Sequence, residues 1–368
     1  MKRYLLPLAV ALFLISCGEK KSSDPYSALR PKVDSLFASV NDFSGVVLLA
    51  EEGKTIYHKA FGFNNFDTRE PMDTASTFEL ASVSKQFTSM IIMMLKEEGK
   101  LNYDDPLEKY IPGLPYKNIT IRHLLTHTSG LPDYQAVMDK YWDKTKVAGN
   151  TECIEYLIRY KPAKLFEPGE KYEYSNTGYM LLASVAEKAS GIDFISFART
   201  RIFVPLKMTT TDIRTQEEKT QLRKMAWGHI WVDEKGAYVR ADSMIQFNYG
   251  IWLGNRKGPG RISSTSTDLL KWDQSLYQQR LVKDTTLAEA FKPMKLNSDS
   301  LSYYGFGWAI EEHPNLGKVV RHSGGNPGYN TYIIRYIDVN RTIILLCNNA
   351  HPKFKEILTG IESSFAPR

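Results

Sequence analysis

The sequence has only three cysteines among 368 residues, and none of them lies in a metal-binding pattern. The apolar run from Leu5 to Ile15 is too short to span a bilayer as a mature helix. No run of lysine and arginine interleaves with aromatic residues, and the net charge is only +6, so we expect no nucleic-acid partner. The chain also lacks a G-x-S-x-G elbow and a phosphate loop, so neither an α/β-hydrolase nor a nucleotide enzyme is supported.

The amino terminus resembles a bacterial lipoprotein signal. Lys2 and Arg3 precede the apolar run, which ends in Leu-Ile-Ser-Cys, and this ending resembles a lipobox in which Cys17 becomes lipidated. The alternative is an ordinary signal peptide with an incidental cysteine. We expect a lipoprotein signal peptide at residues 1–17, a tether at 18–25 and a hydrolase domain at 26–368. The protein would then be lipid-anchored in the bacterial cell envelope, on the periplasmic side or at the cell surface.

Two further cysteines, Cys153 and Cys347, remain in the expected mature chain. A disulfide between them is an option in an oxidising compartment. Cys347 ends the apolar run that begins at Ile343, so we favour a buried free thiol.

Hydrophobic periodicity predicts one sheet built from both ends of the chain. Five β-rich runs lie near the two ends, at residues 45–50, 55–61, 318–321, 331–337 and 342–347. Apolar patterns typical of helices lie next to these runs, at residues 29–40, 83–95 and 354–365. Because hairpins pair neighbouring strands, we expect an antiparallel sheet flanked by helices, an α+β fold. Residues 26–100 and 300–368 would form this α/β lobe, and residues 101–299 a mainly helical lobe.

Ser82 and Lys85 are the first candidate catalytic residues. A serine hydroxyl is a weak nucleophile near neutral pH and needs a base beside it. Three residues apart at the start of a helix, the two side chains lie on one face within reach of each other. Burial of Lys85 in this apolar helix would lower its pKa, so that a neutral amine accepts the serine proton.

Tyr174 and Asn176 form a second candidate element, in the triplet Tyr-Ser-Asn. A tyrosine beside a cationic lysine can lose its proton and serve as general acid or base. Asn176 offers an amide donor and acceptor to the substrate. Another Tyr-x-Asn triplet, at residues 116–118, lacks the turn-then-helix context, and we interpret it as a surface loop.

A third element follows a predicted strand and consists of His322, Ser323, Gly324 and Gly325. Small residues at this position would let a substrate lie along the strand edge. The backbone N–H groups of Gly325 and Ser82 would form an oxyanion hole.

These three motifs, in this order, resemble the penicillin-recognising serine hydrolases, in particular the class C β-lactamase-like family with its D-alanyl-D-alanine carboxypeptidases and esterases. The resemblance covers roughly residues 30–365 and includes familiar stretches at 121–132, 264–269 and 304–308. It implies a β-lactamase/transpeptidase-like fold with the active site between the two lobes. It also implies an acyl-enzyme on Ser82, with Lys85 and Tyr174 moving the proton. Which of these two is the acylation base stays open.

The resemblance predicts a serine hydrolase that needs no cofactor and acts as a monomer on a small-molecule or peptide substrate. A D-amino-acid peptide or a small ester is the expected substrate. Class C β-lactamases carry a lysine where this chain has His322, so the positive charge there would be weaker and pH-dependent, which argues against a dedicated β-lactamase. A non-catalytic sensor of β-lactams or peptidoglycan is the alternative of another class. His123 and His127 have a zinc-like i, i+4 spacing, but the glutamate base between them is missing, so we expect no metal site.

Overall fold

The computed structural model describes residues 24–365 of the chain. The predicted signal peptide, the predicted lipidation site Cys17 and most of the predicted tether lie outside the described residues. Within the described range, no helix combines the length and the apolar character needed to cross a membrane.

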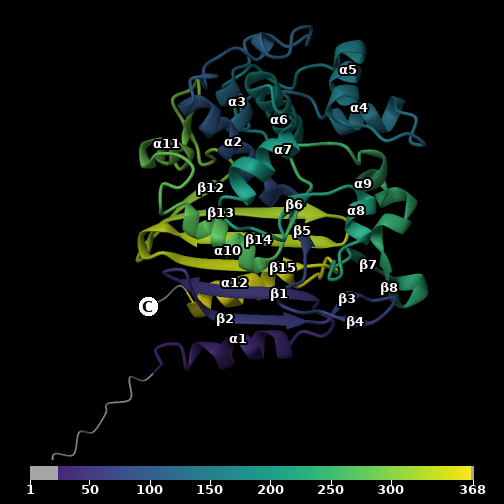
Figure 1. Ribbon diagram of the computed structural model, residues 1–368, viewed down its shortest axis with the longest axis vertical. Coiled ribbons are helices and arrows are strands. Elements are labelled where there is room, and N and C mark those ends of the chain that lie inside the picture. The colour runs from purple at the N-terminus through teal and green to yellow at the C-terminus, as the bar shows by residue number, and fades with distance from the viewer. Residues whose placement is uncertain (1–23, 366–368) are drawn as a thin grey trace, which may run out of the picture.

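A six-stranded antiparallel sheet forms the middle of the molecule, with the strand order β12-β13-β14-β15-β1-β2 (Figure 1). Within it β1 pairs with β15, so that Gly45 lies opposite Cys347. The sheet therefore joins both ends of the chain, as the sequence predicts. Its strands are β1 (Gly45–Glu51), β2 (Lys54–Phe61), β12 (Ala309–His313), β13 (Gly317–Asn326), β14 (Tyr329–Tyr336) and β15 (Arg341–Cys347).

Both faces of the sheet are buried, because successive side chains of a strand point to opposite faces. Along β1, Val46 and Leu48 belong to one core cluster, and Val47 and Leu49 belong to the other. The second cluster is covered by the two terminal helices, and the first by helices that lead toward the other lobe. In chain order these helices are α1 (Leu29–Ala38), α2 (Lys85–Glu97), α10 (Ser266–Ser275) and α12 (Phe354–Phe365).

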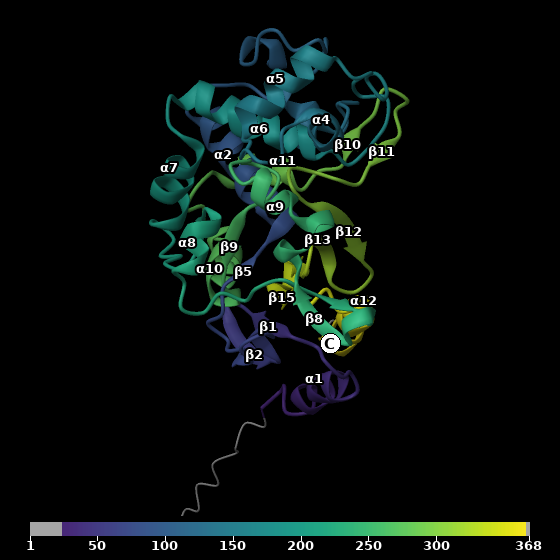
Figure 2. The same ribbon diagram turned by 90° about the vertical axis from the view of Figure 1, so that its right-hand side faces the viewer.

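A lobe of helices lies at one end of the molecule, beyond the β12 side of the sheet (Figures 1 and 2). In it α6 packs on α2 and α3, while α4 packs on α5. The side chains of α6 are buried along most of its length, so this helix forms the centre of the lobe. The helices are α3 (Ile121–Leu125), α4 (Tyr134–Tyr141), α5 (Asn150–Tyr160), α6 (Asn176–Ser190) and α7 (Phe194–Ala198).

Short elements connect the two lobes. They are β3 (Phe63–Asn65), β4 (Glu70–Pro71), β5 (Phe78–Glu79), β6 (Asp212–Ile213), α8 (Gln216–Thr220), β7 (His229–Val232), β8 (Ala237–Arg240), α9 (Tyr249–Trp252), β9 (Ile262–Ser264), α11 (Asp284–Ala290), β10 (Met294–Lys295) and β11 (Leu301–Ser302). One three-stranded group, β5-β9-β6, is important for the site because β5 leads directly to Ser82.

The structure differs from the sequence prediction in two places. Strand β12 was not among the predicted strands, because of its five residues only Ile310 is buried and two are glutamates, a composition typical of an edge strand. Helix α10 lies within the range predicted for the helical lobe, yet it packs on β15 and β1 of the sheet. Its position depends on contacts with strands far away in the sequence.

Candidate active site

Ser82 lies in a tight 3₁₀ turn, Ala81–Ser84, that runs directly into α2. The turn is anchored on both sides, because the Leu80 N–H donates to the Ile262 carbonyl (2.8 Å) and the Thr331 hydroxyl donates to the Leu80 carbonyl (2.7 Å). Ala81 has a φ of +48°, in the left-handed region that non-glycine residues seldom adopt. The surrounding contacts therefore hold the backbone before Ser82 in a strained conformation.

Lys85 lies beneath Ser82 and is completely buried. Its Nζ lies 3.0 Å from Ser82 Oγ, 2.8 Å from Asn176 Oδ1 and 2.9 Å from the carbonyl oxygen of Pro259. Burial, together with the positive charge of Arg256, holds the pKa of Lys85 well below its usual range. A neutral amine has two N–H donors and one lone pair. In a neutral Lys85 the two carbonyl oxygens would accept from these donors, and the lone pair would be left for the Ser82 hydroxyl.

Tyr174 lies on the other side of Ser82, in the loop before α6. The centre of its ring is 4.8 Å from Lys85 Nζ. Burial raises the pKa of Tyr174 above its usual value, and the nearby Ser82 hydroxyl opposes this rise. The phenol is thus protonated near neutral pH. Ser175 caps α6 by accepting from the Gly178 N–H (3.2 Å), which fixes Tyr174 and Asn176 on either side of the cap.

His322 is buried on β13, with both ring nitrogens engaged. Its Nδ1 donates to the Ser323 carbonyl (2.6 Å), and its Nε2 accepts from the Tyr304 hydroxyl (2.8 Å). Burial and the nearby Lys85 lower the pKa of His322 to about 3. The positive charge at His322 is therefore even weaker than the sequence suggested, because burial in these contacts favours the neutral imidazole near neutral pH.

The strand edge beyond His322 is free. β13 pairs with β14 over Val319–Asn326, but β12 covers only Gly317–Arg321 on the other side. Within the part of the chain that the structure describes, no strand pairs with this edge from residue 322 to residue 326. Ser323 and Gly325 are exposed there, and a Cβ added at Gly325 would meet no atom within 4 Å. An extended substrate therefore has room to pair with this edge.

His127 supports the site from below, although the sequence indicated only a structural loop there. Its Nδ1 accepts from the Ser175 N–H (3.0 Å), and its ring lies 4.3 Å from the ring of Tyr174. His123 caps α3 instead, accepting from the Thr120 N–H (3.2 Å). Among residues 24–365, no three His, Cys, Asp or Glu side chains are grouped so as to hold a metal ion.

Sequence reasoning missed three contributors to the site. Tyr304 lies in the stretch 304–308 that resembles the family, but nothing in the sequence indicated its hydrogen bond to His322. Pro259 contributes only a carbonyl oxygen, which no residue pattern can reveal. Arg256 acts through its charge on Lys85. Cys347, by contrast, is a buried free thiol as predicted.

The family model named Beta-lactamase matches residues 33–362 of the chain. The chain belongs to the Beta-lactamase family. The resemblance seen in the motifs and the predicted β-lactamase/transpeptidase-like fold are both confirmed. Like the hydrolases of this family to which it is related, the protein is a serine hydrolase.

Relatives within the Beta-lactamase family differ in what their names say they do. A penicillin-binding protein of Bacillus subtilis (strain 168) is 40% identical over 323 residues, covering 87% of this chain and 72% of that protein. A D-aminopeptidase of Brucella anthropi is 26% identical, covering 81% of this chain and 54% of that protein. The chain therefore spans between about half and three quarters of these curated relatives.

A solved structure of the family superposes over almost the whole chain. It is a penicillin-binding protein from Bacillus halodurans, 26% identical, with a TM-score of 0.77, covering 92% of this chain and 99% of that one. The arrangement of the lobes around Ser82 is therefore the arrangement found in that relative.

Proposed function

We propose that Ser82 is the nucleophile of an acyl-transfer reaction on an amide or ester, and that neutral Lys85 is its base. The observation that carries this proposal is the set of contacts of Lys85 Nζ. Two carbonyl oxygens lie within hydrogen-bond distance of it, and so does Ser82 Oγ, at 3.0 Å, where the lone pair of a neutral amine would receive the serine proton. A buried lysine with a lowered pKa in this geometry is suited to accept the serine proton.

In the first half-reaction, Ser82 Oγ attacks the substrate carbonyl carbon and its proton passes to Lys85 Nζ. The bond from that carbon to the leaving nitrogen or oxygen then breaks, and the leaving group takes a proton through the Tyr174 phenol. The acyl group stays on Ser82. In the second half-reaction, water attacks the acyl carbon and its proton passes to the same pair. The bond from the acyl carbon to Ser82 Oγ then breaks, that proton returns to Ser82 Oγ, and the acid product leaves.

Two backbone N–H groups, of Ser82 and Gly325, are proposed to stabilise the negative oxygen of the tetrahedral intermediates. The strained turn at Ala81 sets the direction of the Ser82 N–H, and Gly325 lies on the free edge of β13. Asn176 uses its oxygen on Lys85, so its amide NH₂ group is available for a substrate carbonyl. His322 and Ser323 would line the leaving-group end, whereas buried Gly324 serves the packing of the turn.

For the substrate, we propose a D-amino-acid peptide or a small ester. The free edge of β13 suits an extended peptide, and relatives of the chain are named a D-aminopeptidase and a penicillin-binding protein. A dedicated β-lactamase is disfavoured because neutral His322 supplies no positive charge for a β-lactam carboxylate. We further propose, as expected from the sequence, that the protein is a lipid-anchored monomer in the cell envelope.

Labelling with a fluorophosphonate or fluorescent penicillin probe tests the nucleophile. The wild type and Ser84→Ala should be labelled, since Ser84 Oγ only accepts the Ile262 N–H (3.2 Å), and Ser82→Ala should not. Labelling of Ser82→Ala would overturn the proposal. A panel of D-Ala-D-Ala peptides, p-nitrophenyl esters and a chromogenic cephalosporin, compared by kcat/KM, then identifies the substrate class. A permanent adduct without turnover would indicate a sensor instead of an enzyme.

A further inference from the structure

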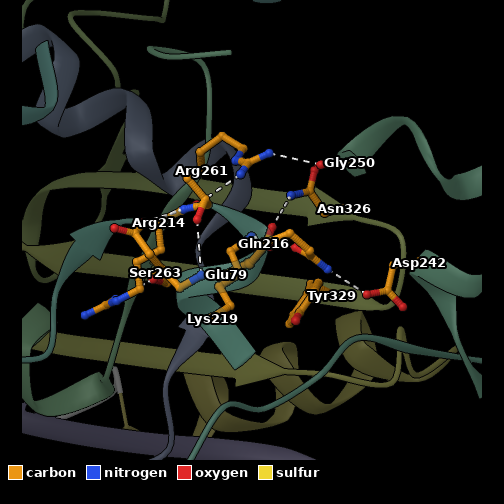
Figure 3. Close-up of polar contacts among 12 residues, drawn as sticks. Glu79, Arg214, Gln216, Lys219, Asp242, Gly250, Arg261, Ser263, Asn326 and Tyr329 are labelled. Atoms are coloured by element: carbon orange, nitrogen blue, oxygen red, sulfur yellow. Dashed lines mark hydrogen bonds and ion pairs between the residues drawn. The ribbon is translucent and has the colours of Figure 1, made fainter. Parts of the chain in front are cut away.

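A small cavity of about 50 Å³ lies beside the Ser82 turn. It is bounded by β5, by the end of β13 and by the loop that leads to β9, and charged, amide and aromatic side chains line it (Figure 3). This volume has room for a carboxylate group or a few water molecules. The residues that decide its chemistry are Glu79, Asp242, Arg256, Arg261 and Asn326.

The two acidic side chains of the cavity are already neutralised. Glu79 forms an ion pair with Lys219 and accepts from the Asn326 amide (3.2 Å) (Figure 3). Burial opposes its ionisation, but Lys219 and Arg261 lower the pKa of Glu79 to about 2. Asp242 accepts from Gln216 (2.8 Å) and from two nitrogens of Arg240. Neither acid is thus available to bind a cationic ligand.

The two arginines of the cavity, in contrast, are not hydrogen-bonded to any carboxylate among the described residues. Arg261 is 3% exposed and donates only to the carbonyl oxygens of Gly250 and Arg214 (3.0 Å each), as Figure 3 shows for Gly250. Arg256 is 7% exposed and donates to the Tyr134 hydroxyl (2.7 Å). In both side chains Nε is buried and lacks a partner among the described residues. Glu79 acts on Arg261 only through its charge. Two buried guanidinium groups that line a cavity without a hydrogen bond to a carboxylate favour an anionic ligand.

The cavity adjoins the catalytic groups. Asn326 follows Gly325 on the free edge of β13, and Glu79 is three residues before Ser82. The Arg256–Arg261 loop also supplies the Pro259 carbonyl that contacts Lys85. A Cβ at Gly260 would lie 3.6 Å from the Ala81 carbonyl oxygen and 3.8 Å from Arg256 Nη2. One loop therefore joins the arginines to the backbone beside Ser82.

The acyl half of a substrate would extend toward this cavity. Tyr174, which protonates the leaving group in our proposal, has its ring 6.2 Å from that of His322, at the opposite end of the free edge. The leaving group would then lie at the His322 end and the acyl group at the Asn326 end.

We propose that this cavity binds a carboxylate carried by the acyl half of the substrate, with Arg261 and Arg256 as its anchors. The substrate class is accordingly an N-acylated D-amino-acid amide or peptide whose acyl part ends in a free carboxylate. The planar guanidinium donors match a carboxylate in shape as well as in charge. This assignment rests on the proposed function, since it places the acyl group on Ser82.

D-Alanine p-nitroanilides with N-caps of three charge types test the proposal. Succinyl and glutaryl caps are acidic, their methyl esters are neutral, and a β-alanyl cap is cationic. For the wild type we expect kcat/KM to be at least about tenfold higher for an acidic cap than for its methyl ester, the worth of hydrogen bonds to a charged group. Arg261→Gln should bring the ratio close to one. The ratio within one variant does not depend on the fraction of folded enzyme, and Arg201→Gln, at a partly exposed arginine paired with Glu98, serves as the matched control.

Binding to Ser82→Ala gives a second measurement that does not require turnover. Calorimetry with N-succinyl-D-alanine amide should show an affinity at least about tenfold weaker when Arg261→Gln or Arg256→Gln is added to Ser82→Ala. If neither acidic cap is preferred over its methyl ester by the wild type, the carboxylate subsite is overturned. It is also overturned if the preference remains in both Arg261→Gln and Arg256→Gln. Labelling of Ser82→Ala would instead refute the catalytic proposal and leave the binding result to stand by itself.

Discussion

Gly324 of β13 packs directly on the carbonyl group of Leu80, two residues before Ser82. A Cβ at Gly324 would lie 2.2 Å from the Leu80 oxygen and 2.3 Å from Thr331 Oγ1, much closer than atoms can approach. Gly325, its neighbour, has nothing within 4 Å of the same position. The two adjacent glycines therefore have different functions, one in packing the turn and one in leaving the strand edge open.

Gly324→Ala should destabilise the fold and abolish probe labelling, because the turn that carries Ser82 must move away from β13. We expect a loss of about 1–3 kcal/mol in the free energy of unfolding, measured by urea denaturation. Gly325→Ala is the matched control for stability and should change it by less than about 1 kcal/mol. Its effect should appear as a higher KM. Equal stability losses in both variants would contradict the packing function of Gly324.

Lys85→Arg should lower kcat/KM by about a hundredfold or more, the usual contribution of a general base. Arginine keeps its charge at every accessible pH and has no lone pair for the Ser82 proton. In the wild type, kcat/KM should fall as the pH drops through the lowered pKa of Lys85, because protonation removes that lone pair. Lys96→Arg, at the carboxyl end of α2, is the control and should retain full activity. A fully active Lys85→Arg enzyme would exclude Lys85 as the base.

His322 should make the fold sensitive to acid. Its pKa in the folded state is about 3, lowered by burial and by Lys85 from a usual value of 6.5. Between these two values the unfolded chain binds a proton that the folded chain does not. Each pH unit below 6.5 therefore costs the folded state about 1.4 kcal/mol. His322→Gln should remove this dependence.

Urea unfolding of the wild type and His322→Gln at pH 7, 6 and 5 measures this effect. The stability of the wild type relative to the variant should decrease as the pH falls. A difference that stays constant with pH would show that His322 becomes protonated within the fold.

Asp273 and Arg335 form an ion pair between α10 and β14 with exposed fractions of only 0% and 1%. The Asp273 carboxylate also accepts from the Thr342 hydroxyl (2.8 Å). Asp273→Asn should cost about 3–5 kcal/mol, because it leaves the Arg335 charge buried without compensation. Asp299→Asn breaks the exposed pair with Lys295 and should cost less than about 1 kcal/mol. Similar unfolding midpoints for the two variants would refute this explanation of how α10 is held on the sheet.

The sequence by itself determined the features that depend on local spacing. The Ser82–Lys85 pair lies within one helical turn, so its geometry follows from three residues of separation. The β-rich runs of β1, β2, β14 and β15 and the hairpin between the first two indicated the antiparallel sheet, and the order of the three motifs indicated the family. Each of these signals lies in a short segment.

Tertiary structure alone decided the features that depend on contacts between distant segments. The Pro259 carbonyl beneath Lys85, the neutral state of His322 and the unpaired guanidinium groups of Arg256 and Arg261 have no local signal. Burial and hydrogen-bond partners set the charge of a group, and both arise only when remote parts of the chain pack together. For the same reason, the chemistry beside Ser82 could be read only from the folded molecule.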